Sequence, residues 1–204
     1  MRASVLMGLL AGLHAAGSAQ AMPSVEPVVA VRMDAGAQPA VGPAHQKHAQ
    51  AWRLLLPDAQ PAGRGRLTVW GFEVYDASLW VSPGFRHAQF ERHAFALDLA
   101  YLRAFSGREI AERSISEMRR AGSFDAAQGQ RWQAALQALL PPVQRGDRLT
   151  GVHRPGQGAT FLFNGEAVGE IADSEFARLF FAIWLGERSS ESALRRQLVA
   201  GTPP

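Results

Sequence analysis

The chain shows strand-like alternation of apolar and polar residues in three regions. Residues 65–82 alternate around Gly71, which predicts two strands, or one long bent strand, with a turn or bulge at that glycine. Between residues 146 and 171, a Pro-Gly pair and an Asn-Gly pair separate three short strands. A further strand is indicated by four alternating large residues: Phe95, Leu97, Leu99 and Tyr101.

Helical spacing of apolar residues predicts four helices. The first starts at a capping box of Ser106 and Glu109 and ends near Gly122. The other three are expected over residues 125–139, 173–186 and 189–198. Strands come first, then two helices, then strands and two more helices. This order predicts an α+β fold, in which one antiparallel sheet carries helices on one side.

The third of these helices, "EFARLFFAIWLG", is apolar around most of its circumference. Phe176, Leu179, Phe180 and Ile183 form an ordinary core stripe at helical spacing. Phe181 and Trp184 widen that stripe, which indicates a helix buried on more than one side or facing a pocket. The segment is too short to cross a bilayer.

The first 21 residues have the features of a secretory signal peptide. Arg2 precedes an apolar run over residues 5–17, and Ala19-Gln20-Ala21 fits the cleavage pattern of small residues. We expect cleavage after Ala21, a mature chain that begins at Met22 without a membrane span, and a periplasmic location in a Gram-negative source. Residues 22–50 are rich in Ala, Pro and Val and predict a flexible lead-in, with one short strand near residues 28–32. Residues 51–204 are expected to form the folded domain.

Composition limits the chemistry. The chain has 204 residues, 47% hydrophobic and 19% charged, which is typical of a globular protein. A net charge of +3 without a basic cluster argues against nucleic-acid binding. The absence of cysteine excludes disulfides and thiolate chemistry. His45 and His48 have no third ligand nearby in sequence, so we expect no metal and no cofactor.

Three stretches in order are similar to the chalcone isomerase-like superfamily, specifically its bacterial secreted branch. They are "AGRGRLTVWGFEVYDASLWV", "LRAFSGREIAERSISEM" and "IADSEFARLFFAIWLGERSSESALRRQL". The resemblance covers about two-thirds of the chain. It implies an open-faced β-sandwich, a large antiparallel sheet with a layer of helices on one face.

The resemblance also implies where an active site would lie. The family's arginine falls on Gly65, with Arg64 and Arg66 on either side, so a slip of one residue would keep the charge. Its strand threonine falls near Tyr75. Three further positions depart from the family pattern: Ile110 replaces a tyrosine, Glu117 an asparagine and Ala177 a serine or threonine.

These replacements favour a non-catalytic protein that binds a small hydrophobic acid, similar to a fatty acid, in an apolar cleft. Arg66 or Arg64 would pair with the carboxylate, and Phe181 and Trp184 would line the tail. Two alternatives remain open. The first is an isomerase or lyase with Glu117 or Asp76 as base and Tyr75 or Tyr101 as acid. The second is a filled cleft with a structural or protein-binding role, for a partner that the sequence does not identify.

Overall fold

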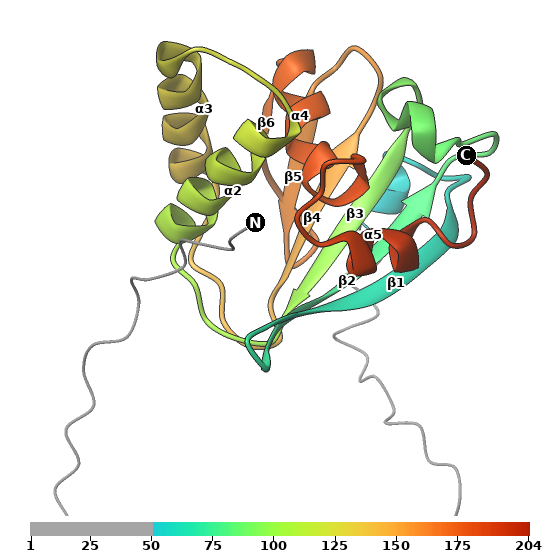
Figure 1. Cartoon of the computed structure of the whole chain (residues 1–204), viewed down its shortest axis with the longest axis horizontal. Coiled ribbons are helices and arrows are strands. Elements are labelled where there is room, and N and C mark those ends of the chain that lie inside the picture. Colours follow the sequence, from blue (N-terminus) through green and yellow to red (C-terminus); the bar gives the residue numbers. More distant parts are fainter. Residues whose placement is uncertain (1–50) are drawn as a thin grey trace, which may run out of the picture. The chain divides into compact units, whose positions relative to one another are not determined.

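The computed structural model describes residues 51–204, which form a single antiparallel sheet covered on one face by helices (Figure 1). The six strands are hydrogen-bonded in chain order, each antiparallel to the next. They are β1 (Gln60–Val69), β2 (Phe72–Val81), β3 (Phe95–Tyr101), β4 (Arg148–His153), β5 (Ala159–Phe163) and β6 (Glu166–Ile171). The expected α+β architecture, an open sheet with one helical layer, is therefore confirmed.

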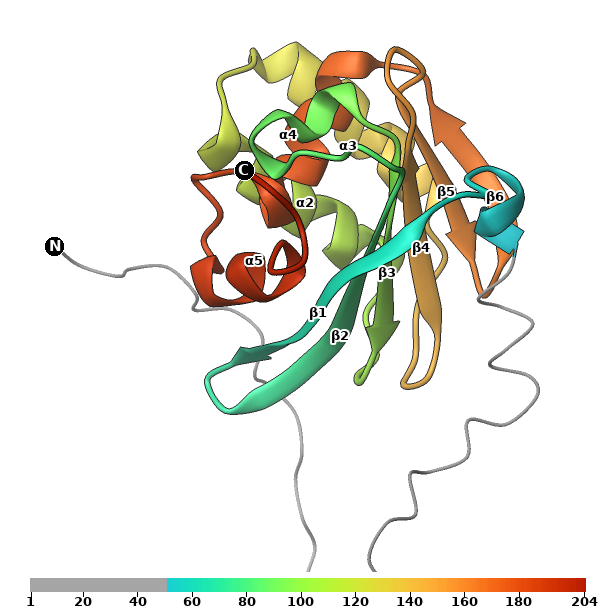
Figure 2. The same cartoon turned by 90° about the vertical axis from the view of Figure 1, so that its right-hand side faces the viewer.

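Four α-helices lie on the inner face of the sheet, and Figure 2 shows them together on one side of the strands. They are α2 (Gly107–Ala121), α3 (Ala126–Leu139), α4 (Ser174–Leu185) and α5 (Ser192–Leu198). Two short 3₁₀ helices that the sequence pattern did not predict are η1 (Ala51–Leu54) and η2 (His87–Arg92). None of the helices in residues 51–204 is long and apolar enough to cross a membrane.

Side-chain caps explain where the helices begin. Ser106 and Glu109 form the predicted capping box at the start of α2, with each side chain bonded to the backbone of the other residue. Asp125 accepts a backbone N–H at the start of α3. Asp173 does the same for α4 and also accepts a hydrogen bond from the Trp132 indole, which ties α3 to α4.

The main core lies between the sheet and the helices, where α4 is almost wholly buried. Phe176, Phe181 and Leu179 of this helix are inaccessible to solvent. Phe181 packs against the backbone of Gly151 on β4, where a Cβ atom would lie 3.0 Å from the ring. The interpretation of this segment as a core helix is therefore confirmed. Apolar residues surround most of the helix because it is packed on several sides.

A smaller core covers part of the outer face of the sheet. Trp52 and Leu56, from η1 and the turn after it, pack against Ala96, Val152 and Leu162. The folded domain thus includes residues before β1 that cover apolar residues of the central strands. The signal peptide and the lead-in expected over residues 1–50, including a strand near residues 28–32, lie outside the described residues.

Candidate functional site

Three aromatic residues meet between the sheet and the helices. Tyr75 on β2 and Tyr101 on β3 are paired in the strand register, and their rings meet edge to face with centroids 5.9 Å apart. Trp184 of α4 donates its indole N–H to the Tyr75 hydroxyl oxygen at 2.9 Å. The sequence singled out all three residues, and the structure places them in one buried cluster.

Burial dominates the electrostatics of both tyrosines. It raises the pKa of Tyr75 well above the usual range, and the Trp184 hydrogen bond partly opposes this effect. Smaller contributions to the pKa of Tyr75 come from the charges of Glu191, Arg113 and Glu117. Burial likewise raises the pKa of Tyr101. Both hydroxyls therefore stay protonated above the pH at which a free tyrosine ionises, and the Tyr75 oxygen accepts the Trp184 N–H.

An apolar wall extends from this cluster along the sheet. It encloses a void lined by Leu97, Leu99, Leu149, Gly151, Phe161, Phe180, Phe181 and Trp184. The void is about 10 Å³, roughly the space of one water molecule, so side chains fill the cleft in this structure. Trp184 and Phe181 lie on its wall, but there is no open channel for a ligand tail among these residues.

Arg66 and Arg64 do not face this cleft, contrary to the expectation from the sequence. Arg66 pairs in register with Asp76, and its guanidinium binds the Asp76 carboxylate at 2.6 and 2.9 Å and also contacts Glu73. The neighbouring pair, Leu67 and Tyr75, faces inward. Because side chains alternate along a strand, Arg64, Arg66 and Asp76 occupy the solvent face. Asp76 is an ion-pair partner on that face, away from the Tyr75 hydroxyl.

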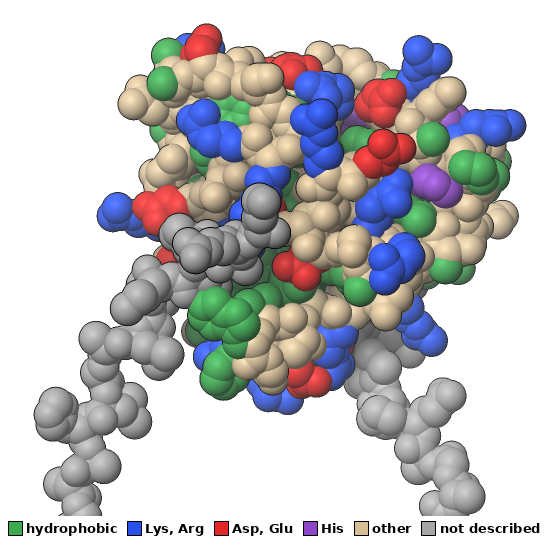
Figure 3. All heavy atoms as spheres, viewed as in Figure 1, with side chains coloured by type: hydrophobic (Ala, Val, Ile, Leu, Met, Phe, Trp, Pro, Cys, Tyr) green, Lys and Arg blue, Asp and Glu red, His purple; other side chains and the backbone are tan. Residues whose placement is uncertain are grey.

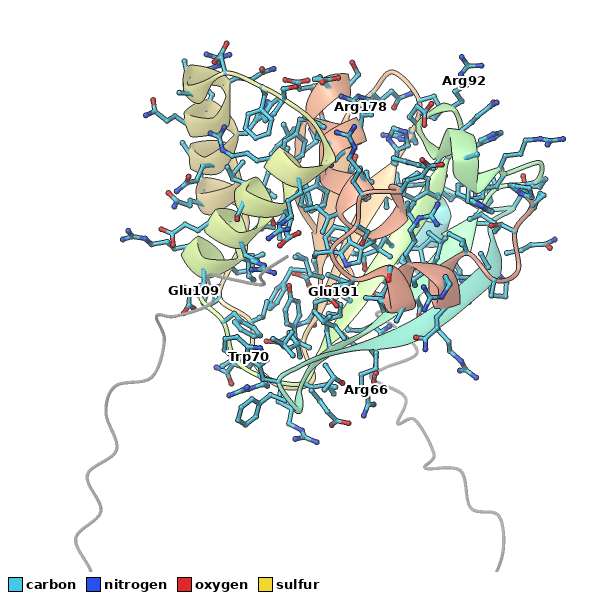
Figure 4. The ribbon with its side chains drawn as sticks, viewed as in Figure 1. Arg66, Trp70, Arg92, Glu109, Arg178 and Glu191 are labelled. Carbon is cyan, nitrogen blue, oxygen red and sulfur yellow. The ribbon has the colours of Figure 1, made fainter. Side chains whose placement is uncertain are left out.

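The charges that influence the pKa of Tyr75 come from the helices. Glu117 of α2 is only 6% exposed and lies between two arginines: Arg113 at 2.8 Å and Arg120 at 3.6 Å. The nearer contact is an ion pair without hydrogen-bond alignment, since the carboxylate oxygen that faces Arg113 has no hydrogen-bond partner. Glu191, at the N-cap of α5 (Figure 4), is a second negative charge that raises the pKa of Tyr75.

A larger hollow of about 270 Å³ lies elsewhere, at the surface near η2 and the end of α4. Charged side chains dominate its rim, and one of them, Arg178, is bound to Glu175 through two hydrogen bonds. The lining of this hollow is charged, whereas that of the cleft is apolar, and no predicted site residue lies in the hollow. Within residues 51–204, no group of three acidic or histidine side chains could hold a metal ion.

Residues 61–200 match the family model described as chalcone isomerase-like. The chain belongs to the chalcone isomerase-like family. Among solved structures, it is similar to a fatty-acid-binding protein of Arabidopsis thaliana, with a TM-score of 0.56 and 12% sequence identity. That match covers 70% of this chain and 87% of the other, and at this identity it shows the fold alone. Curated protein sequences give no significant match.

The position of the chalcone isomerase-like arginine has no space for a side chain in this protein. Gly65 points to the inner face, where a Cβ atom would lie 2.1 Å from the Gln197 side chain and 2.8 Å from Leu194. Both residues belong to α5, which packs directly over β1. The charge is therefore not kept by a slip of one residue, because the flanking arginines point the other way.

The remaining chalcone isomerase-like positions offer little polar chemistry. Ile110 is partly buried and packs against the main core, and Ala177 is fully buried within it. Of the predicted site residues, Tyr75, Tyr101 and Trp184 are brought together, and the charge of Glu117 reaches Tyr75. The structure separates Arg64, Arg66 and Asp76 from this group.

Sequence reasoning missed Arg113 and Glu191. Arg113 stands one helical turn before Glu117, a spacing that indicates an ion pair on the same face of a helix. Glu191 reaches Tyr75 through the tertiary fold, and its sequence context carries no such signal. The alternation of arginine with glycine in "GRGR" already indicated that both arginines share one strand face.

Proposed function

We propose that this protein is a non-catalytic binding protein for a fatty-acid-like hydrophobic molecule, taken up between the sheet and α4. The observation that carries this proposal is an apolar wall with one polar end. Leucine and phenylalanine side chains line the void, and the Tyr75 hydroxyl and Trp184 indole meet beside it. The fold shared with a fatty-acid-binding protein also supports binding of a fatty-acid-like molecule.

Binding requires the wall to open, because the void is far smaller than an acyl chain. The Trp184 side chain joins α4 to β2 through one hydrogen bond, so opening the cleft would require Trp184 and the phenylalanine side chains on the wall to move. A ligand oxygen could then accept hydrogen bonds from both Tyr75 and Trp184, which replaces the bond that was broken. Each buried methylene of the tail would contribute about 0.8 kcal/mol before ordering costs.

The headgroup preference follows from the charges near Tyr75. Arg66 cannot hold a carboxylate there, since it is engaged by Asp76 and Glu73 on the solvent face. Arg113 is the arginine whose charge lowers the pKa of Tyr75, and it is already paired with Glu117. The affinity would therefore come from the tail and from neutral donors, so that an acid and its methyl ester bind with similar strength.

A fluorescence titration with saturated acyl chains of increasing length, as acids and as methyl esters, tests the proposal. We expect affinity to rise about fourfold per methylene until the cleft is full. The chain has five tryptophans, so the same titration of the Trp184→Phe variant shows how much of the fluorescence change comes from Trp184. Tyr75→Phe should weaken both ligand series, and Arg66→Ala should leave both unchanged. Native mass spectrometry of the protein from its source would identify a ligand that co-purifies.

A filled cleft with a structural or protein-binding role is the second candidate, and the small size of the void favours it. It predicts a flat titration at every chain length and a clean apo mass. An isomerase or lyase with an unusual residue set has less support. Of its two candidate bases, Asp76 is bound to Arg66 on the far face, and Glu117 is bound by Arg113 and Arg120.

We further propose that the protein works in the periplasm after removal of residues 1–21. The support is the sequence of that segment: a positive start, a short apolar run and Ala19-Gln20-Ala21. The absence of cysteine means that folding after export would need no disulfide formation.

A further inference from the structure

The turn between β1 and β2 holds a tryptophan where turn geometry favours other residues. Trp70 and Gly71 form this two-residue turn, and both have positive φ angles, 50° and 82°. Such turns favour Asn, Asp or Gly, because a bulky side chain is strained in the left-handed region. Trp70 therefore does not serve the stability of the turn.

Trp70 and Phe72, here called the aromatic tip, also gain little from burial. Trp70 is 70% exposed and Phe72 is 55% exposed. Among residues 51–204, the only other large hydrophobic side chain of comparable exposure is Leu54, at 86%. The hairpin reaches beyond the neighbouring strands (Figure 2), and Trp70 lies at its turn (Figure 4). Isolated exposed hydrophobic residues are ordinary, but two aromatics on one strained, projecting turn are not.

Positive charge lies directly beside the aromatic tip. The Arg103 guanidinium stands over the Phe72 ring, 4.8 Å from its centroid. No carboxylate of the described residues forms an ion pair with Arg103, whereas Arg66, further along the hairpin, is bound by Glu73 and Asp76. Figure 3 shows hydrophobic side chains gathered at this lower end, with Lys or Arg side chains beside them.

We propose that the aromatic tip inserts into the interface of a lipid bilayer that carries anionic headgroups. Trp and Phe partition into the headgroup region, and an unpaired arginine next to them attracts lipid phosphates. The tip is convex and small. Two aromatic side chains offer at most about 150–250 Å² each, which is less than the roughly 800 Å² that each partner contributes to a standard protein interface. A fluid interface, by contrast, accommodates a narrow projection and binds it reversibly.

Co-sedimentation with vesicles tests this proposal on the full-length mature protein. The vesicles are pure phosphatidylcholine, or phosphatidylcholine mixed with phosphatidylglycerol. Trp70→Asn is the decisive variant, because Asn suits the left-handed turn and should leave the unfolding midpoint equal or higher. We expect it to weaken binding to the mixed vesicles by at least about tenfold. Arg103→Gln should weaken binding to mixed vesicles by about fivefold and leave binding to neutral vesicles unchanged.

Leu54→Asn is the matched control, since it removes another highly exposed hydrophobic residue away from the hairpin and should have no effect on binding. Each variant differs from the native chain at one residue, so vesicle binding by any other segment contributes equally to both and does not affect the comparison. The proposal is overturned if the native chain binds neither vesicle, a result that points to a protein partner, or if Trp70→Asn binds as the native chain does. Equal losses in Trp70→Asn and Leu54→Asn would also overturn it. None of these measurements depends on ligand binding at Trp184.

Discussion

The indole nitrogen of Trp184 and the hydroxyl oxygen of Tyr75 are 109 positions apart in sequence and 2.9 Å apart in the structure. This hydrogen bond fastens the most apolar helix to the second strand at the polar end of an otherwise apolar wall. It satisfies the indole donor in a buried site, where an unpaired polar group is costly. The same bond would have to break before the cleft could admit a ligand.

A double-mutant cycle measures this bond. Trp184→Phe leaves the Tyr75 hydroxyl without its donor, and Tyr75→Phe leaves the indole without its acceptor. Each change should lower the free energy of unfolding by about 1–3 kcal/mol in denaturant titrations. The double variant should be more stable than additivity predicts by about 1 kcal/mol, since both partners are then removed. Strictly additive losses in the double variant would show that the two side chains do not interact in solution.

Alkaline titration tests the burial of the tyrosines. Tyr75 and Tyr101 are the only tyrosines in the chain, and burial raises the pKa of each above that of a free phenol. The native protein should therefore show no tyrosinate absorbance near pH 10, where the unfolded chain ionises.

The sign of the stability change follows from the same shift. Between the tyrosine pKa of the unfolded chain and the raised pKa of the native state, the unfolded state binds fewer protons. The contribution of each buried tyrosine to the free energy of unfolding is therefore fully present below about pH 10 and is lost as the pH rises above that value. The slope should be about 1.4 kcal/mol per pH unit for each tyrosine. Tyr75→Phe should halve the slope. A native chain that titrates like free tyrosine would show that the cluster is open to water.

The capping box of α2 gives a test of local stability. Ser106→Ala removes a hydroxyl that accepts the Glu109 N–H and should cost about 1 kcal/mol of unfolding free energy. Ser116→Ala, at an exposed position inside the same helix, is the control and should be near neutral or slightly stabilising.

The capping box also makes stability depend on acid pH. Hydrogen bonds from the backbone and side chain of Ser106 lower the pKa of Glu109. This contribution is present above the ordinary glutamate pKa and is lost as pH falls through the lowered value. Glu109→Gln should therefore flatten the acid side of the stability profile. An unchanged profile would mean that the carboxylate does not cap the helix in solution.

Chalcone cyclisation should proceed near its spontaneous rate with this protein. Ile110 and Ala177 offer no donor, Gly65 has no space for an arginine, and the negative charge of Glu117 would repel a phenolate. Loss of a single oxyanion donor typically costs on the order of 100–1,000-fold in rate. The assay follows flavanone formation and its stereochemistry. A stereoselective, protein-dependent rate would contradict the non-catalytic proposal.

The export prediction is checked by N-terminal sequencing of the protein isolated from its source. We expect the first residue to be Met22, because Ala19-Gln20-Ala21 follows a short apolar run. A chain that still begins at Met1 would remove the periplasmic assignment. A variant that carries Arg in place of Ala19 should be processed poorly, since the peptidase requires small residues there.

Local patterns determined the strands and the four α-helices of this protein. Alternation located the strands, and caps such as Ser106 and Asp173 located the helix starts, because a strand or a helix end is fixed by residues close together in sequence. Three ordered motifs indicated the family, and the match over residues 61–200 confirmed it. Period-two alternation also predicts that Arg64 and Arg66 share one strand face, and the inward position of Tyr75 on the paired strand shows that this face is the solvent face.

Tertiary packing decided the state of the cleft. Whether Phe181 and Trp184 line a channel or fill it depends on the space that Gly151, Leu97 and Tyr75 leave for them. In the sequence, Gly65 only marks a position where the family has an arginine. The structure gives the reason for the glycine: α5, which starts more than 120 residues later, leaves no space for a side chain there. Packing volume and buried hydrogen bonds are properties of residues brought together from distant segments, and neither periodicity nor composition records them.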